Sequence, residues 1–290
     1  RGPLQFLFRK TGQYRTSPSW ASRFTLSTPG SAAQALTKAA PLSVRSSTIR
    51  SSPWAVRLRL FTRLALLVPR ETATDHHYAL ATLFEIMDVT SRTDFKADLL
   101  RELDRQNKVF ESYRGIPSIS EAALDLAVDR IVGAHRRLAA TPGRPEQTLA
   151  GNEWLMAVRS RIHIPGGTCE FDLPGYFAWQ QEPAPKRRHD LLRWVGVLDP
   201  LAEALEVNLG LLRESGVQQM AGLRNSLFQL NLNGSRALQL VRLEVDPASQ
   251  LIPEISGNRV LLAIRLSRAD AEGRLRPMND SVQLPLTLCA

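Results

Sequence analysis

The chain has 290 residues, of which 43% are hydrophobic, and its formal net charge at pH 7 is +9. This length and apolar content suffice for two packed subdomains, and no run of 18 consecutive apolar residues predicts a membrane-spanning helix. Two cysteines, Cys169 and Cys289, are too few for a disulfide framework, so we expect the reduced thiols of a cytosolic protein.

The positive charge is concentrated near the N-terminus. Twelve Lys and Arg residues precede Glu71, the first acidic residue, so residues 71–290 hold 25 basic and 28 acidic groups and have a net charge of −3. A nucleic-acid-binding protein that uses the basic N-terminal segment is therefore an alternative function. If residues 71–290 bound nucleic acid, their folded surface would be expected to carry a basic face or groove. We predict no nucleic-acid partner and no membrane partner for the chain.

Residues 1–56 form a segment of their own. They are rich in Ser, Arg and Pro, contain no acidic residue and show neither a helical nor a strand period. An organellar transit peptide has this composition, and so does a sequence read in a shifted frame or from a mis-assigned start. In both cases the patterned apolar surface is too small to offset the entropy of ordering. We therefore expect residues 1–56 to be disordered.

Residues 57–216 have helical patterning, with apolar residues recurring at spacings of three and four. One such stripe consists of Ala79, Leu80, Leu83, Phe84, Ile86 and Met87. Turn residues at Gly115–Pro117 and Thr141–Pro145 separate successive helices. A capping box from Ser118 to Glu121 predicts the start of one helix, and Asp199-Pro200 predicts the start of the last. We expect an N-terminal helical bundle domain over residues 57–216.

The period changes to two after residue 216. In residues 238–246 and 258–267, apolar residues alternate with charged ones, which are Arg242, Glu244, Arg259 and Arg265. Half-buried antiparallel strands produce this alternation. Residues 217–290 therefore predict a smaller antiparallel β-strand domain. Helices followed by strands make the predicted fold class α+β.

Motifs for catalysis are missing from the sequence. It contains no phosphate loop, dinucleotide fingerprint, nucleophile elbow or zinc-protease motif. His76 and His77 are adjacent and point about 100° apart on a helix, which is poor geometry for one metal ion. Glu170 and Asp172 could form a catalytic carboxylate pair, although capping or pairing with arginine is commoner. We predict that the chain is not an enzyme and uses no cofactor and no metal.

Arginines supply a more useful signal. Arg242, Arg259 and Arg265 fall on the polar side of predicted strands, and they share one face if those strands are neighbours. Arg159 and Arg161 precede a Pro-Gly-Gly turn. A solvated face partly neutralised by acids explains these positions. A basic surface that binds an acidic peptide also explains them, because the planar guanidinium pairs bidentately with carboxylates.

Three segments carry a resemblance to a known family. They read RIHIPGGTCEFDLPGYFAW at Arg161–Trp179, LIPEISGNRVLLAIRL at Leu251–Leu266 and LLRELDRQ at Leu99–Gln106. In this order, from about Leu60 to the end, the sequence resembles the bacterial ZapD family of cell division factors. Before Leu60 the resemblance is lost abruptly. Because a bacterial family has no organelle to enter, we interpret residues 1–56 as non-native or mis-framed.

The resemblance implies a function and an assembly. ZapD proteins bind FtsZ, the tubulin-like GTPase of the division ring, through its C-terminal tail, and they cross-link FtsZ protofilaments into bundles. The resemblance therefore implies a cytoplasmic homodimer, recruited to mid-cell, with FtsZ as its partner and no enzymatic activity. A two-fold dimer with one tail site per subunit would join two filaments.

The resemblance also ranks the arginines. It makes Arg92 the best candidate in the helical part and Arg265 the best in the strand part, and Arg259 matches a position that is basic in relatives. Leu261 stands where some relatives have another arginine, so the basic surface is expected to be arranged differently here. The predicted FtsZ-tail site consists of Arg92, Arg242, Arg259, Arg265, Arg159 and Arg161.

Overall fold

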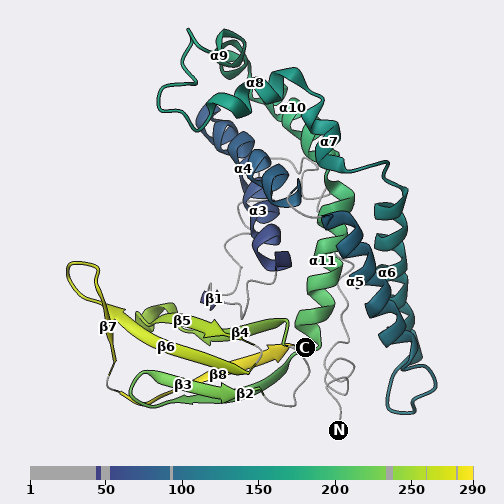
Figure 1. Cartoon of the computed structure of the whole chain (residues 1–290), viewed down its shortest axis with the longest axis vertical. Coiled ribbons are helices and arrows are strands. Elements are labelled where there is room, and N and C mark those ends of the chain that lie inside the picture. The colour runs from purple at the N-terminus through teal and green to yellow at the C-terminus, as the bar shows by residue number, and fades with distance from the viewer. Residues whose placement is uncertain are drawn as a thin grey trace, which may run out of the picture. The chain divides into compact units, whose positions relative to one another are not determined.

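The computed structural model describes residues 44–46, 53–91, 94–232, 238–258, 260–278 and 280–289. These residues divide into two compact units, with the boundary between Asn208 and Leu209, inside helix α11 (Asp199–Glu214). The helical unit contains residues 56–208. The strand unit contains the residues from Leu209 onward together with β1 (Val44–Ser46). Helices precede antiparallel sheets along the chain (Figure 1), so the α+β fold class is confirmed.

The helical unit is organised around α4 (Ala73–Ser91), which is buried on most of its circumference. Its side chains Leu80, Leu83, Phe84 and Ile86 have no exposed surface. A helix that is apolar on so many sides needs neighbours on several faces. Within this unit those neighbours include α5, α7 and α10. The other helices of the described chain are α3 (Pro53–Leu67), α5 (Phe95–Glu111), α6 (Glu121–Ala140), α7 (Pro145–Ala150), α8 (Glu153–Arg161), α9 (Pro174–Gln181) and α10 (Ala184–Gly196).

The start of α6 differs from the predicted capping box. Ser120, not Ser118, is the N-cap residue, and its hydroxyl accepts a hydrogen bond from the amide of Ala123 at 3.4 Å. The Glu121 carboxylate accepts from the amide of Gly115 at 2.8 Å. The prediction of Ser118 was wrong because the helix begins two residues later than the spacing suggested, which frees Glu121 to fix the preceding turn.

Aromatic side chains join the last helices of the unit. Trp154 of α8, Tyr176 and Trp179 of α9 and Trp194 of α10 pack with ring centroids 5.2 to 6.2 Å apart. Rings in contact at these separations stabilise a core beyond the area they bury. The Tyr176 hydroxyl accepts from the Gln180 amide at 3.1 Å and lies 2.6 Å from Nδ1 of His77. With His77 in the tautomer protonated on Nε2, the Tyr176 hydroxyl donates its own hydrogen to Nδ1 of that ring.

Arg187 of α10 is a buried cation whose hydrogen-bond partners in the described part of the chain are all neutral groups. Its Nε donates to Nδ1 of His76 at 3.0 Å, and His76 Nε2 lies 2.8 Å from the carbonyl oxygen of Arg70. The other guanidinium nitrogens donate to the backbone carbonyls of Glu71, Gln180 and Glu182. His76 must be neutral in this arrangement, because its Nδ1 accepts while its Nε2 donates. Arg187 and its partners thus tie α10 to the start of α4.

The strand unit consists of two antiparallel sheets. The first sheet has the strand order β1-β4-β8-β2, and the second has the order β3-β6-β5, with β7 paired to the distal end of β6. The strands after β1 are β2 (Val217–Leu223), β3 (Leu227–Asn231), β4 (Leu240–Val245), β5 (Ile252–Gly257), β6 (Leu261–Ala269), β7 (Leu275–Pro277) and β8 (Val282–Cys289).

Both sheets pack against one core. Val241 and Leu243 of β4 belong to the same buried cluster as Leu262, Ile264 and Leu266 of β6. Alternate residues of a strand point to opposite faces, so the residues between these positions point away from the core. The two sheets therefore form a sandwich (Figure 1), with their outer faces on opposite sides. The period of two that was predicted for β4 and β6 is confirmed.

Residues 1–56 are not wholly without structure. Val44–Ser46 form β1, which pairs with β4, and α3 begins at Pro53. The expectation of disorder for residues 1–56 as a whole stays a prediction. The rest of the segment lies outside the described residues. None of the helices in the described part of the chain has both the length and the apolar character needed to cross a membrane.

Candidate functional site

Arg265 lies on the outer face of the second sheet. Its neighbours in β6, Ile264 and Leu266, are fully buried, whereas Arg265 is exposed. In the register of the sheet it stands opposite Leu227 of β3 on one side and Glu254 of β5 on the other. Despite that neighbour, Arg265 makes no ion pair with any residue in the described ranges. Its guanidinium is available to an external carboxylate.

Small polar and apolar side chains surround Arg265. In the next row, Ala263 stands between Gln229 of β3 and Ser256 of β5, both of which are exposed. We call the surface of these two rows the Arg265 face, and its residues are Leu227, Gln229, Glu254, Ser256, Ala263 and Arg265. Arg265 and Glu254 are the charged residues among these six.

Arg242 does not share this face. Its strand, β4, belongs to the first sheet, and β6 belongs to the second, so the two strands are not neighbours. Both strands point their apolar residues into the common core, which sends Arg242 and Arg265 to opposite sides of the sandwich. The condition for a shared face, that the two strands are neighbours, is therefore not met for this pair. Local alternation fixes the face of a strand, whereas pairing depends on residues distant in sequence.

Arg242 is also held by its own sheet. It is half-buried and makes an ion pair with Glu244, at 3.1 Å between nitrogen and oxygen. The nearby Cys289 thiol is buried, and burial raises its pKa to about 11 against the opposing effect of Arg242 and Arg213. This environment resembles a structural contact more than an exposed binding surface.

Two of the predicted arginines lie outside the described residues. Arg92 follows the end of α4 at Ser91, and Arg259 lies in the turn between β5 and β6. The Asn258 side chain that precedes Arg259 accepts hydrogen bonds from the amides of Val260 and Leu261 at 2.8 and 2.9 Å. The roles predicted for Arg92 and Arg259 stay predictions.

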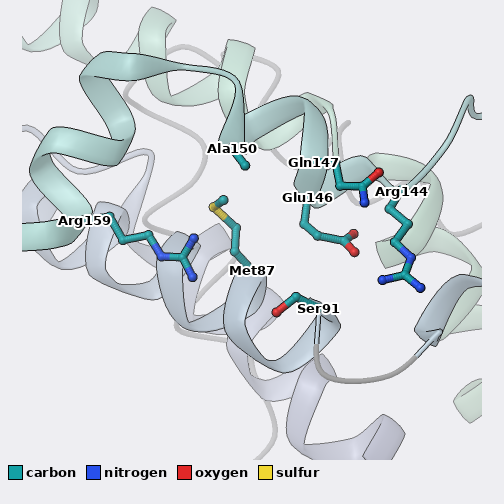
Figure 2. A pocket seen from close by; sticks show the side chains of 7 residues that line it. All are labelled: Met87, Ser91, Arg144, Glu146, Gln147, Ala150 and Arg159. Carbon is teal, nitrogen blue, oxygen red and sulfur yellow. The ribbon is translucent and has the colours of Figure 1, made fainter.

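Arg159 lines a cavity of about 130 Å³ in the helical unit, which we call the Arg159 pocket. Figure 2 shows Arg159 on one side of the pocket and Arg144, Glu146 and Gln147 on the other, with Met87 between them. Its walls come from α4, the start of α7 and α8, and its residues are Met87, Ser91, Arg144, Glu146, Gln147, Ala150 and Arg159.

The charges of the Arg159 pocket are partly compensated. Arg159 contacts the carboxylate of Asp88 one turn before Ser91. Arg144, by contrast, has no ion pair with any residue that the structure describes. Glu146 is 7% exposed and directs its carboxylate into the pocket. The sequence reasoning missed Arg144, because an arginine before a proline reads only as the start of a helix.

Arg161, the last residue of α8, contacts the compact loop that follows it and does not line the pocket. Its guanidinium lies 3.6 Å from the Asp172 carboxylate, which also accepts from the Cys169 thiol at 3.6 Å. Gly166 has a φ of +74°, and a Cβ on Gly167 would come within 2.9 Å of the carbonyl oxygen of Arg161. Both glycines are needed for this tight turn. Asp172 therefore pairs with an arginine here, the commoner of the roles considered for it.

No group of metal ligands forms among the described residues. In the ranges that the structure describes, no three His, Cys, Asp or Glu side chains come together in a way that could hold a metal ion. Both cysteines are free thiols. The features that can recognise a partner are the Arg265 face in the strand unit and the Arg159 pocket in the helical unit.

Comparison with known proteins identifies the family. The model of the ZapD family, described as a cell division protein, matches residues 57–265, more than half of the chain. The chain is 43% identical over 231 residues to the cell division protein ZapD of Ralstonia pickettii (strain 12J), covering 79% of this chain and 91% of that protein. It is 44% identical over 231 residues, with the same coverage, to the cell division protein ZapD of Ralstonia nicotianae (strain ATCC BAA-1114 / GMI1000). The chain therefore belongs to the ZapD family of cell division proteins.

Proposed function

We propose that this chain binds the C-terminal tail of FtsZ and cross-links FtsZ protofilaments, which stabilises the division ring at mid-cell. Its membership of a family of cell division proteins supports a role in that process. The observation that carries the molecular part is Arg265, an exposed guanidinium in the middle of a sheet face without an ion pair among the described residues. A carboxylate of the tail supplies that missing partner, through charge-assisted hydrogen bonds.

The helical unit adds a second group of contacts in this proposal. Arg144 and Arg159 line a pocket large enough for an acidic side chain, and Arg92 follows its rim residue Ser91. Arg159 is already engaged by Asp88, so Arg144 is the better donor of the two. Bundling then needs at least two tail sites in one particle, which a cytoplasmic homodimer provides by symmetry. No catalytic step and no cofactor enter this function.

Low-speed pelleting of GTP-assembled FtsZ with the full chain tests the proposal. Wild-type protein is expected to pellet full-length FtsZ and not FtsZ that lacks its C-terminal tail. The variant Arg265→Glu is expected to lose pelleting, because it replaces the cation by a repelling carboxylate on an exposed face. Arg224→Glu is the matched control, since Arg224 is exposed on the same unit and the charge change is identical.

The outcomes separate the proposal from its rivals. Pelleting that does not require the tail would overturn the tail as the binding element. Equal loss in Arg265→Glu and Arg224→Glu would show that overall charge, and not the Arg265 face, attracts FtsZ. Retention of a DNA duplex with no effect on FtsZ would favour the alternative in which the basic N-terminal segment binds nucleic acid.

A further inference from the structure

The end of β6 and β7 form a hairpin that extends beyond the rest of the second sheet. The pairing of β6 with β3 stops at Arg265 and its pairing with β5 stops at Ser267, so from Arg268 onward β7 is its partner. We call residues 268–276 the β6–β7 hairpin. Figure 1 shows this hairpin with its connecting loop at the end of the sheet. The family model ends at Arg265 and does not cover it.

The tip of the hairpin is well defined by hydrogen bonds. The amide of Asp270 donates to the carbonyl of Arg274 at 2.9 Å, and the amide of Gly273 donates to the carbonyl of Asp270 at 2.9 Å. The Asp270 carboxylate accepts from the amides of Glu272 and Arg274 at 3.2 and 2.8 Å. Gly273 has a φ of +78°, the left-handed conformation that closes three-residue hairpin loops. The flanking side chains are therefore presented on a rigid ribbon.

Two arginines stand directly opposite each other on this ribbon. Arg268 of β6 is paired in register with Arg276 of β7, and both are exposed. Arg276 makes an ion pair with Asp270 at 3.1 Å, whereas Arg268 makes no ion pair with any residue in the described part of the chain. The Asp270 carboxylate thus pairs with one of the two guanidinium groups and leaves the other unpaired among the described residues. Like charges directly opposite each other in a sheet are destabilising, so stability alone does not account for the pair.

We propose that Arg268 and Arg276 form a second site for an acidic protein segment, on FtsZ, in addition to the Arg265 face; this inference rests on the proposed function. A carboxylate placed between the two guanidinium groups accepts hydrogen bonds from both and removes their repulsion. Arg265 and Arg268 are three positions apart in one strand, so they point to opposite faces. Each chain then contacts acidic segments on two faces.

Charge balance favours a peptide over nucleic acid at the hairpin. Residues 268–276 hold three arginines and two carboxylates, which are Arg268, Arg274, Arg276, Asp270 and Glu272. Binding to a nucleic-acid backbone depends on many phosphate contacts and a continuous basic surface. One open position between two guanidinium groups instead matches a single carboxylate side chain in a protein segment.

The variant Arg268→Glu tests this site with two measurements on the full chain. Replacing one of two opposed arginines by glutamate creates a cross-strand ion pair, so the thermal unfolding temperature is expected to stay equal or rise. Binding to assembled FtsZ, measured by pelleting over a range of protein concentrations, is expected to weaken about tenfold. Arg224→Glu again controls for the change in net charge. Arg268→Gln, which removes the charge without adding one, is expected to weaken binding less.

Unchanged stability with weakened FtsZ binding is the signature of a binding site, because a purely structural arginine would not show it. The inference is overturned if Arg265→Glu loses pelleting while Arg268→Glu behaves like Arg224→Glu; the proposed function then stands without a second site. It is also overturned if Arg268→Glu lowers the affinity for a DNA duplex and leaves FtsZ binding unchanged. If Arg265→Glu and Arg268→Glu both pellet FtsZ as the wild type does, neither the Arg265 face nor the β6–β7 hairpin contacts FtsZ, and the inference is overturned. The proposed function itself fails only if the wild-type chain pellets no FtsZ or pellets it without the tail.

Discussion

The two units use arginine in opposite ways. In the helical unit Arg187 is buried and has four internal hydrogen-bond partners, and Arg159 contacts Asp88. In the strand unit Arg265 and Arg268 are exposed and form no ion pair with any described residue. The net charge of the chain does not distinguish a buried, internally bonded arginine from an exposed arginine without an ion pair. An exposed arginine therefore indicates a binding surface only where its guanidinium makes no ion pair with a neighbouring carboxylate.

Replacement of Arg187 tests the structural role of a buried arginine in the helical unit and is expected to have the largest effect. The variant Arg187→Met is expected to destabilise the helical unit by about 3–5 kcal/mol, because it leaves the backbone carbonyls and His76 without donors in a buried site. Urea unfolding followed by tryptophan fluorescence reports on this unit through its packed Trp154, Trp179 and Trp194 rings. Arg193→Met is the matched control, since Arg193 is on the same helix with an exposed side chain. Equal midpoints for the two variants would contradict a structural role for Arg187.

The pH dependence of the same contact gives a smaller effect. Burial lowers the pKa of His76, and the nearby Arg187 and Arg188 cations lower it further, while backbone hydrogen bonds raise it. Burial also lowers the pKa of His77. Both rings accept at Nδ1, one from Arg187 and one from Tyr176, and protonation removes that acceptor. Because the pKa of His76 is lower in the folded chain than its ordinary value of 6.5, the unfolded chain binds protons first as the pH falls. The free energy of unfolding is therefore highest above pH 6.5 and decreases as the pH falls below that value.

Unfolding of the full chain at pH 7.5 and at pH 5.5 measures this loss. Asp199 acts in the opposite sense, because burial and the neighbouring Glu203 raise its pKa to about 6. The histidine contribution is therefore isolated with His76→Gln, which keeps an acceptor and removes the titrating group. This variant is expected to lose less stability between the two pH values than wild type, while His163→Gln, at an exposed histidine, is expected to behave as wild type. A pH response that His76→Gln leaves unaltered would assign the effect to other groups.

The Pro-Gly-Gly turn tests whether the loop holding Arg161 is built by backbone geometry. In Gly167→Ala the new Cβ would lie 2.9 Å from both the carbonyl oxygen of Arg161 and the Cβ of Ile164. We expect a loss of about 1–3 kcal/mol in unfolding free energy. Gly196→Ala is the control, because a Cβ there meets no atom within 4 Å and Ala favours a helix. A Gly167→Ala protein as stable as wild type would show that the turn can relax.

Sequence patterns predicted those features that depend on residues close together in the sequence. The period of two placed Arg242 and Arg265 on the outer side of their strands, and the structure agrees. Patterns did not predict that these strands lie in different sheets, because sheet assignment depends on β8 and β3, which are distant in sequence. Arg187 stands between Lys186 and Arg188 and reads as one of three surface cations. Its burial follows from partners more than 100 positions away.

Glu254 offers the smallest and most specific test of the strand side of the comparison. It stands opposite Arg265 in register, and both are exposed, so it lowers the positive potential at the guanidinium without forming an ion pair in the described structure. We expect Glu254→Gln to strengthen FtsZ-tail binding about twofold to fivefold, in the range of an exposed charge pair, with a smaller gain at high salt. Asp280→Asn, an identical charge change at an exposed carboxylate outside both the Arg265 face and the β6–β7 hairpin, controls for net charge. Equal gains in the two variants would mean that the tail senses the total charge of the unit and not the row that contains Arg265.

A gain confined to Glu254→Gln that disappears when Arg265→Gln is added would show, as a double-mutant cycle, that the two residues act on the same ligand.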